Sequence, residues 1–432
     1  MWKGYWKRWL WLVGILALGS AFAQKTSITF YYPVGVAGPL ARFIESYVAE
    51  FTKRNPDIEV KTVFGGNYEE NQAKVLAAIK AGSPPDTAIL LSQQLYTLLS
   101  LDAIEPFDPY IAKDRELRQA VADFFPAFMM NSTLGGKVYS LPFQRSTPIL
   151  YYNKEAFKEV GLDPEKPPTT WDELVEYAEK LTKRDAQGRV VRYGVAIPTE
   201  NRSTWLLEAL TIQAGGLLYD PRGEGCKVLV NTEAVRQGMQ FKRDLAAKYK
   251  VSPEGVIAWG TTPGDFAAGK VAMIYHSTGS LGFIRTNARF SFGTAFLPKK
   301  VRYGVPTGGA NFYLFKGSDP AKREATLRFI KFMVSPEIQA RWALDSGYVA
   351  ARRSSWSLPL MQEYLKQWPQ ALTAREQLAH AKAELPVYNL QQVKDIIAEA
   401  EQAVVLGQKD VRSAVREAQA RVDQALAPYC RK

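Results

Sequence analysis

The sequence holds little of the chemistry that catalytic sites need. It contains two histidines, His276 and His380, which are distant in the chain and have no metal-ligating partner at helical spacing. The Gly-x-Ser-x-Gly motif of serine hydrolases is absent, and no cluster of paired carboxylates is visible. We therefore expect a protein that is not an enzyme, with no catalytic residues, no cofactor and no metal.

Cysteine is equally scarce, with Cys226 and Cys430 as the two examples. Two cysteines are too few for the disulfide framework of a small secreted domain. In an oxidising compartment they can pair and hold the C-terminal tail, but the sequence does not place them within bonding distance. A disulfide and two free thiols are both open.

One glycine-rich segment comes close to a phosphate-binding loop. Gly264, Gly269 and Lys270 have the spacing of that motif, but Val271 stands where a hydroxyl would bind Mg²⁺. The segment also precedes a predicted strand, whereas a phosphate-binding loop follows one. We interpret it as a tight turn into a strand.

Long apolar runs are absent except at the N-terminus. Lys3, Lys7 and Arg8 precede an apolar run over 10–18, and Ala21 and Ala23 occupy the small-residue positions of a signal-peptidase site. We predict a signal peptide over 1–23 and a protein exported to the periplasm or another extracytoplasmic space. An uncleaved membrane anchor is the alternative.

The chain is basic without being concentrated in charge. Its formal charge is +12, but 55 Lys and Arg are interspersed with 43 Asp and Glu and form no long basic run. This pattern argues against nucleic acid as a partner and favours an anionic ligand or an anionic membrane surface nearby. The length of 432 residues suits two domains.

Hydrophobic periodicity predicts alternating strands and helices. Strands at 27–32, 58–64 and 87–91 are separated by helices at 40–51 and 67–81, which predicts a parallel sheet wrapped by helices. Further strands are expected at 149–152, 190–197, 271–275, 292–296 and 312–315. Further helices are expected at 172–183 with Thr170 as its N-cap, at 205–215, 233–248 and 320–333, and over most of the chain from 360.

The segments that follow the strands are the best candidates for a binding site. In open α/β sheets ligands bind beyond the carboxyl ends of the strands, where residues 31–35, 65–68 and 92–94 should meet. Tyr68, after a glycine pair and before a helix, is the aromatic ring best placed to bind. The hydroxyls of 276–280 at a predicted helix start favour an anion, and Gly308 and Gly309 would let a ligand approach the main chain.

Several segments resemble, in order, the extracellular solute-binding proteins of ABC importers, in the subgroup that includes the maltose- and glycerol-3-phosphate-binding proteins. The matching segments cover nearly the whole mature chain and are 141–157, 66–69, 161–164 with Thr170 and Trp171, 266–273, 277–281, 308–310 and 346–348. The resemblance implies a two-lobe α/β fold like that of maltose-binding protein. One lobe would hold 24–143 and 297–345, and the other 144–296 and 346–432.

The same resemblance implies how the protein would work. The lobes would close over a small-molecule ligand by a hinge motion, and the closed protein would dock on the membrane permease of the importer. We expect a monomer. Within the family the chain is most similar to the members that bind glycerol 3-phosphate, so we expect that solute or a glycerophosphodiester.

The resemblance also identifies binding residues. Tyr68, Ser146, Ser277, Gly309 and Tyr348 match positions in the ligand cleft of those members, and Arg202 and Trp205 lie in the segment that supplies a cleft-lining aromatic. The acidic residue that binds the glycerol hydroxyls is replaced by Ser92, and residues 385–389 lack the phosphate-binding arginine. Arg145 or Arg202 could replace that arginine from another wall.

Two other functions remain open from the sequence. A neutral sugar or oligosaccharide would use Tyr68, Trp205, Trp259 and Tyr348 as platforms against its faces. A secreted glycerophosphodiester hydrolase would require a metal-binding or acid–base cluster, which the sequence does not show.

Overall fold

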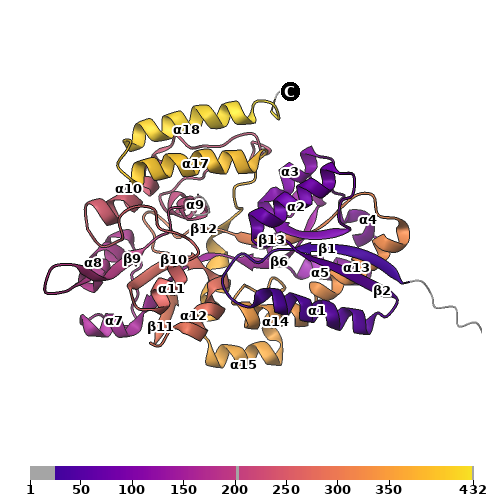
Figure 1. The fold of residues 1–432 in the computed structure, drawn as a ribbon, viewed down its shortest axis with the longest axis horizontal. Helices are drawn as coiled ribbons and strands as arrows, with labels where there is room; N and C mark the ends of the chain where they lie inside the picture. The colour runs from indigo at the N-terminus through magenta and orange to yellow at the C-terminus, as the bar shows by residue number, and fades with distance from the viewer. Residues whose placement is uncertain (1–24, 201–203, 431–432) are drawn as a thin grey trace, which may run out of the picture.

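The computed structural model describes residues 25–200 and 204–430 and contains two five-stranded sheets. The first sheet has the order β2 (Ile58–Phe64), β1 (Thr26–Tyr32), β3 (Thr87–Leu91), β13 (Gly308–Leu314) and β6 (Ser140–Ser146). The second has the order β11 (Phe292–Ala295), β7 (Pro148–Asn153), β10 (Val271–Ser277), β9 (Val190–Ala196) and β8 (Lys183–Arg184). This α/β architecture confirms the predicted fold class (Figure 1).

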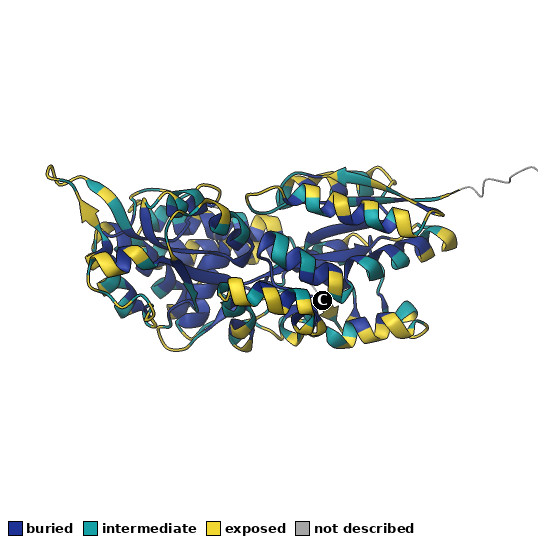
Figure 2. Ribbon diagram, turned by 90° about the horizontal axis from the view of Figure 1, so that it is seen from below, coloured by how far each residue is buried: buried dark blue, intermediate teal, exposed yellow. Residues whose placement is uncertain are grey.

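The first sheet combines a parallel and an antiparallel half. β1 pairs in parallel with β2 and β3, as predicted, while β13 pairs antiparallel with β3 and β6. The helices of this part are α1 (Leu40–Arg54), α2 (Tyr68–Lys80), α3 (Leu95–Ser100), α4 (Asp108–Ile111), α5 (Arg115–Asp123), α6 (Pro126–Met129), α13 (Pro320–Met333) and α14 (Pro336–Ser346). Figure 2 shows buried strands between helices whose outer faces are exposed.

The remaining helices come from the middle and the end of the chain and lie on the second sheet or on one another. These are α7 (Lys154–Glu159), α8 (Trp171–Leu181), α9 (Thr204–Gln213), α10 (Glu233–Ala247), α11 (Thr262–Ala267), α12 (Leu281–Asn287), α15 (Pro359–Gln367), α16 (Gln370–Gln377), α17 (Leu390–Val405) and α18 (Val411–Leu426). Two short ladders, β4 (Thr133–Leu134) with β5 (Lys137–Val138) and β12 (Val305–Pro306) with β14 (Ala381–Lys382), complete the strands.

Capping side chains explain why the predicted helices begin where they do. The Asn67 side chain accepts from the Glu70 N–H, and Glu70 reaches back to the Asn67 N–H, which forms a capping box at the start of α2. Thr170 caps α8 as predicted, because its hydroxyl accepts from the Glu173 N–H. Residues 264–270 form the end of α11 and a turn at Gly269 (φ +72°) into β10, as expected of a structural turn.

Two features of the chain between the sheets differ from expectation. Residues 140–146, which carry no alternating pattern, form the edge strand β6, and the chain then enters β7 of the second sheet through Thr147. The strand predicted at 312–315 begins earlier, at Gly308 and Gly309, which pair with β6, and the register of the two strands shifts between Ala310 and Asn311. A Cβ on Gly309 (φ +89°) would lie 1.8 Å from the Gln144 carbonyl oxygen, so this pairing requires glycine.

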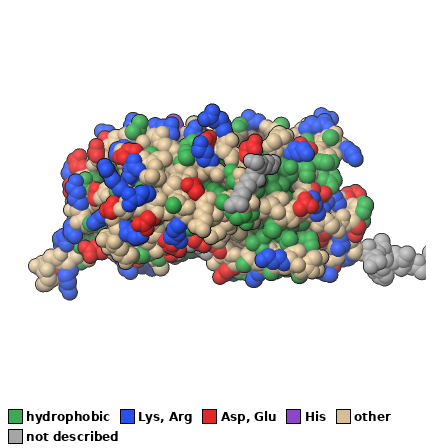
Figure 3. Space-filling view, turned by 90° about the horizontal axis from the view of Figure 1, so that it is seen from above, with side chains coloured by type: hydrophobic (Ala, Val, Ile, Leu, Met, Phe, Trp, Pro, Cys, Tyr) green, Lys and Arg blue, Asp and Glu red, His purple; other side chains and the backbone are tan. Residues whose placement is uncertain are grey.

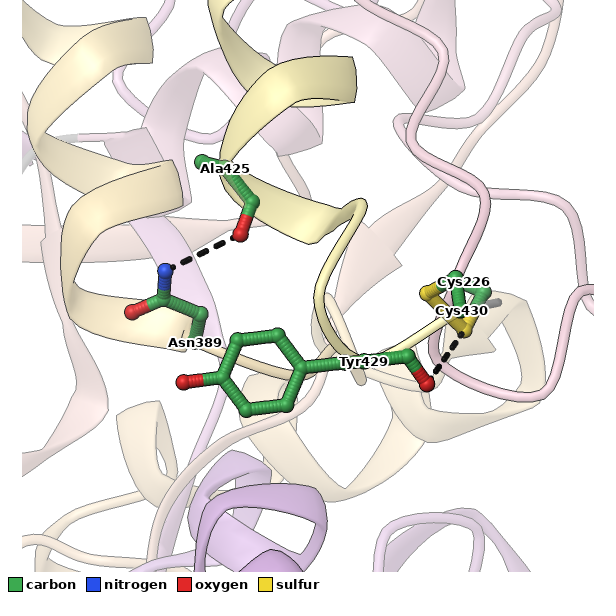
Figure 4. Close-up of a disulfide and its surroundings, with 5 residues drawn as sticks. All are labelled: Cys226, Asn389, Ala425, Tyr429 and Cys430. Atoms are coloured by element: carbon green, nitrogen blue, oxygen red, sulfur yellow. Dashed lines mark hydrogen bonds between the residues drawn. A yellow bond between two sulfur atoms is a disulfide. The ribbon is translucent and has the colours of Figure 1, made fainter. Parts of the chain in front are cut away.

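The C-terminal helices form a hairpin that packs on α9 and α10. Val415, Ala418, Val422 and Leu426 form a stripe at helical spacing along α18 and are buried in the core of this hairpin. Cys226 and Cys430 form a disulfide, with their Cα atoms 5.6 Å apart, which decides between the two possibilities left by the sequence (Figure 4). The bond ties the end of the hairpin to the segment before α10.

Candidate functional site

The pocket of interest lies between the two sheets and has a small volume of about 70 Å³. Both parts of the molecule supply its walls. The lining residues are Gly35, Val36, Tyr68, Glu69, Leu91, Gln93, Ser146, Trp205, Trp259, Ser277, Gly309, Tyr348, Glu384 and Lys394. The turns after β1, β2 and β3 all contribute, which confirms that the carboxyl ends of these parallel strands meet at one site.

A chain of hydrogen bonds fixes the two tyrosines of the pocket. The Gln144 amide donates to the Pro33 carbonyl oxygen (3.1 Å), which turns its own oxygen toward Tyr68. The Tyr68 hydroxyl donates to this oxygen (3.0 Å) and therefore accepts from the Tyr348 hydroxyl, 2.9 Å away. Burial raises the pKa of Tyr348 to about 12 and that of Tyr68 well above its usual value. Both hydroxyls stay protonated at neutral pH.

Small residues allow these rings to sit against the main chain. A Cβ on Gly35 would lie 2.0 Å from the Tyr68 ring, and one on Gly279 would lie 2.8 Å from the Tyr348 ring. A Cβ on Gly308 would lie 2.3 Å from the Trp205 ring. The glycines therefore set the depth at which the aromatic rings enter the pocket.

Ser146 and Ser277 lie at the ends of β6 and β10, on either side of the crossing at Thr147. Both side chains are 3% exposed and line the pocket. The Ser277 hydroxyl also accepts from the Gly279 N–H (3.1 Å), so it caps the following turn, and its own proton is available to a ligand. Of the hydroxyls in the predicted anion-binding segment, that of Ser280 bonds to His276 and is used inside the protein.

His276 is a structural residue. Its Nε2 donates to the Trp259 carbonyl oxygen (3.1 Å), so Nδ1 carries the lone pair that accepts from the Ser280 hydroxyl (2.7 Å). Burial lowers the pKa of His276 to about 3, and the ring is neutral. Its ring lies 3.9 Å from that of Trp259, and the Trp205 indole N–H donates to the Thr307 carbonyl oxygen (3.0 Å). The tryptophan wall is therefore held rigidly.

Three of the predicted site residues are not among the lining residues. Arg145 is fully buried behind the pocket, where its guanidinium donates to the Asn311 side chain (3.1 Å) and stacks on the Phe128 ring. Burial lowers its pKa to about 10, so it remains charged. Ser92 is buried, and its neighbour Gln93 lines the pocket in its place. Arg202 lies outside the described residues.

Sequence reasoning missed two charged residues, Glu384 and Lys394, which line the pocket from the segment before α17 and from α17 itself. They flank residues 385–389, where the expected arginine is missing. A signal was present, because Lys394 interrupts an apolar stripe that includes Val393 and Ile397. Of the described residues that line the pocket, Lys394 is the one with a positive charge.

Glu384 is held firmly at its backbone. The Asn131 amide donates to the Glu384 carbonyl oxygen (2.7 Å), and the Asn131 oxygen accepts from the Glu384 N–H (2.9 Å). Burial raises the pKa of Glu384 to about 7, while the positive charges of Lys394 and Arg145 oppose the shift. The neighbouring Glu208 accepts from the Leu385 N–H (3.0 Å), and burial raises its pKa well above the usual value.

The described residues contain no group of three or more His, Cys, Asp or Glu side chains able to hold a metal ion. Within the same residues, no helix combines the length and apolarity needed to cross a membrane. On the face shown in Figure 3, acidic and basic side chains are interspersed. The chemistry gathered in the pocket is that of hydroxyl groups, aromatic rings, the carboxyl groups of Glu69 and Glu384 and one lysine, which suits recognition of a polar solute.

Comparison with known proteins identifies similar chains. Residues 46–372 match the family described as bacterial extracellular solute-binding protein. The sn-glycerol-3-phosphate-binding periplasmic protein UgpB of Salmonella typhimurium is 30% identical over 96% of this chain and 96% of its own length, and that of Escherichia coli K12 is 29% identical with the same coverage.

Solved structures show the same fold at lower identity. UgpB from Mycobacterium tuberculosis in complex with glycerophosphocholine has a TM-score of 0.81 at 24% identity and covers 94% of this chain and 99% of its own. A Thermotoga lettingae solute-binding protein of an ABC transporter, bound to α-D-tagatose, has a TM-score of 0.80 at 22% identity, with coverage of 93% and 100%. At these identities the structural likeness concerns the fold.

Proposed function

The chain belongs to the bacterial extracellular solute-binding proteins, and from that premise we propose that its ligand is glycerol 3-phosphate or a glycerophosphodiester. Membership of this family establishes that the chain is a solute-binding protein of an ABC importer and not an enzyme. Delivery to the permease would follow hinge closure of two lobes, 24–143 with 297–345 and 144–296 with 346–432. This assignment excludes the secreted hydrolase that the sequence had left open.

The observation that carries this proposal is the convergence of hydroxyl groups with one cation in a small pocket. Ser146, Ser277, Tyr68 and Tyr348 supply polar groups, and Lys394 supplies a positive charge. A phosphate needs charge-assisted donors, and a buried lysine is a strong one, although it lacks the bidentate geometry of arginine. Lys394 would therefore take the place of the arginine missing from 385–389. Arg145 adds positive potential from behind the wall.

The proposed place of action is outside the cytoplasm. Residues 1–23, the predicted signal peptide, lie outside the described residues, and the relatives are named periplasmic proteins. We expect the mature protein, starting at Gln24, to be a monomer in solution. Size-exclusion chromatography with light scattering of that chain tests the oligomeric state.

Calorimetric titration of the mature chain tests the ligand. Glycerol 3-phosphate, glycerophosphocholine and maltose are titrated in parallel, and we expect saturable heat from one or both of the glycerol compounds. Absence of heat from both glycerol compounds would contradict the proposed ligand and leave the family assignment unchanged. Inorganic phosphate alone serves as the control for binding of any anion.

A neutral sugar is the second candidate, and the tryptophan wall favours it. Trp205 and Trp259 lie with ring centroids 6.0 Å apart in the pocket, and such rings pack against sugar faces. A sugar would bind with an affinity that does not change with salt, since it has no charge to screen. Binding of maltose without binding of either glycerol compound would support this candidate.

A further inference from the structure

Two polar groups that line the pocket have no partner within the described part of the chain. Glu384 is 5% exposed and Gln93 is 2% exposed. Glu384 Oε2 and Gln93 Nε2 are both buried, and neither makes a hydrogen bond to a described residue. A buried donor or acceptor that makes no hydrogen bond lowers the stability of the protein. Two such groups in one small pocket therefore point to a ligand that satisfies both.

The chemistry of the two groups selects the part of the ligand that they bind. An ionised carboxylate only accepts hydrogen bonds, whereas the amide nitrogen only donates them. A hydroxyl both donates and accepts, so ligand hydroxyls can satisfy Glu384 and Gln93 alike. A phosphate oxygen without a proton only accepts hydrogen bonds, so it cannot donate to Glu384 as a hydroxyl can, and the ionised form of Glu384 repels it. The hydroxyl end of a ligand fits here.

We propose that Glu384 and Gln93 form the subsite that binds ligand hydroxyls and so orients the solute in the pocket. The phosphate is then directed to Lys394 and to the serine hydroxyls. The backbone of Glu384 is clamped by Asn131 at both its N–H and its carbonyl oxygen, so the carboxylate is presented from a fixed main chain. The choice of phosphate ligand rests on the proposed function, whereas the hydroxyl subsite does not.

A cycle of protein and ligand changes tests the subsite. Glu384→Gln removes the charged acceptor at nearly constant volume, and n-propyl phosphate is glycerol 3-phosphate without its two hydroxyls. We expect E384Q to bind glycerol 3-phosphate at least tenfold more weakly than the wild type does. Its affinity for n-propyl phosphate should stay within about threefold of the wild type, because a charge-assisted hydrogen bond is lost with the first ligand alone. Equal losses with both ligands would overturn the proposal.

Two further variants separate a lost contact from a lost charge or a damaged fold. Glu208→Gln removes a neighbouring buried carboxyl that does not line the pocket and still accepts from Leu385, so it should change affinity less than threefold. Gln93→Met removes the donor at similar length and should weaken the hydroxylated ligand several-fold. A loss in E208Q equal to that in E384Q would show that removing any buried carboxyl near Leu385 has the same effect, and it would overturn the proposal.

The same experiment distinguishes failure of the subsite from failure of the proposed ligand. If the wild type binds no glycerol compound and binds maltose, the ligand proposal fails, and E384Q is then titrated with maltose. Weaker maltose binding would support the hydroxyl subsite, because sugars are rich in hydroxyls. Unchanged maltose binding would overturn it.

A second, independent observation concerns Tyr96, which reaches from α3 to the other part of the molecule. Its ring meets Tyr388 edge-on, with centroids 4.9 Å apart, and a Cβ on Gly225 would lie 2.5 Å from it. The Tyr388 N–H donates to the Gly225 carbonyl oxygen (3.0 Å), and the Tyr388 ring stacks on Tyr429. Gly225, Tyr388 and Tyr429 together form a socket for Tyr96.

The disulfide joins the two ends of this socket. Cys226 follows Gly225 and Cys430 follows Tyr429, so the bond links the residues next to two of the three socket members (Figure 4). We infer that the disulfide pre-arranges the socket and that Tyr96, seated in it, holds the two parts together around the pocket. A socket that is already ordered loses less entropy when the ring enters.

Removing the Tyr96 ring and removing the disulfide test this proposal separately. We expect Tyr96→Ala and the pair Cys226→Ser with Cys430→Ser each to weaken ligand binding about three- to tenfold and to raise the radius of gyration of the ligand-bound protein in small-angle scattering. Tyr177→Ala, which removes a partly buried ring from α8, is the matched control and should change neither. Unchanged ligand affinity in Y96A would overturn the proposal that Tyr96 holds the two parts together. Weaker ligand binding in Y96A but not in the double cysteine variant would overturn the role of the disulfide.

Discussion

Helix α17 carries two buried charged residues on one face, and one of them forms an ion pair within the described part of the chain whereas the other does not. Glu401 forms an ion pair with Lys242 of α10, with both side chains fully buried, and Lys242 also donates to the Pro198 carbonyl oxygen. Lys394, two helical turns earlier, lines the pocket and forms no ion pair with the described residues. A buried charge paired within the protein is expected to serve the fold, whereas a buried charge left open to a pocket is a candidate for binding a ligand.

The largest expected effect follows from breaking the closed pair. Lys242→Met leaves the Glu401 carboxyl buried without its partner, which should lower the free energy of unfolding by about 3–5 kcal/mol. Burial already raises the pKa of Glu401, and the charge of Lys242 opposes that shift. Urea denaturation followed by circular dichroism measures the change. A loss below about 1 kcal/mol would contradict a structural role for the pair.

The same substitution at Lys394, which has no ion-pair partner among the described residues, should weaken ligand binding and have little effect on the stability of the fold. Lys394→Met removes the charge-assisted donor to phosphate and should weaken glycerol 3-phosphate by about 10- to 100-fold, since such a bond contributes about 1.5–3 kcal/mol. Its effect on unfolding should be smaller than that of K242M. Calorimetry and urea denaturation of the two variants side by side check the contrast, and the reverse ranking would refute it.

Glu384 should make stability depend on pH in a defined direction. Its pKa is raised from 4.5 to about 7 by burial, so the native state holds a proton that the unfolded chain loses first. Stability from this group is therefore fully present below pH 4.5 and is lost as the pH rises to about 7. In E384Q this loss disappears. Between these limits the Tm of the wild type should fall relative to that of E384Q by about 1–3 °C.

Calorimetric scans at several pH values measure that difference. His276 acts in the opposite direction, because burial lowers its pKa to about 3 and its contribution grows as the pH rises. It is present in both proteins and cancels in the comparison. Parallel Tm curves for E384Q and wild type would contradict the raised pKa.

The smallest expected effect is that of salt. Lys394 is 9% exposed, so its charge is screened less than a surface charge, and affinity for glycerol 3-phosphate should fall by about two- to fivefold between 50 and 500 mM NaCl. The buried Lys242–Glu401 pair should leave the Tm unchanged over the same range. A salt-independent affinity would shift the balance toward a neutral sugar.

The sequence predicted best where local signals agree. The strands β1, β2 and β3 alternate with amphipathic helices, and the turns after them were expected to meet, so Tyr68 was identified before its hydrogen bonds were known. The β6 strand was missed because all its residues are buried and it shows no alternation. Its partner β13 is distant in the chain, and only the folded protein brings them together.

The charges at the pocket were missed for a different reason. Glu384 and Lys394 lie in and beside a helical region, with Lys394 next to the apolar residue Val393, and a charge run is usually solvated. Their burial depends on the packing of α17 against α9 and α10, which no local pattern encodes. Arg145 was selected because it adjoins Ser146, yet alternate residues of a strand face opposite sides, and its side chain enters the core behind the pocket.

The link between Cys226 and Cys430 spans 204 residues. Everything from α10 to α18 is therefore synthesised before the second thiol exists, and oxidation is a late step of maturation. Protein produced in a reducing cytoplasm would lack this bond, and binding assays on such material would report the properties of the reduced chain.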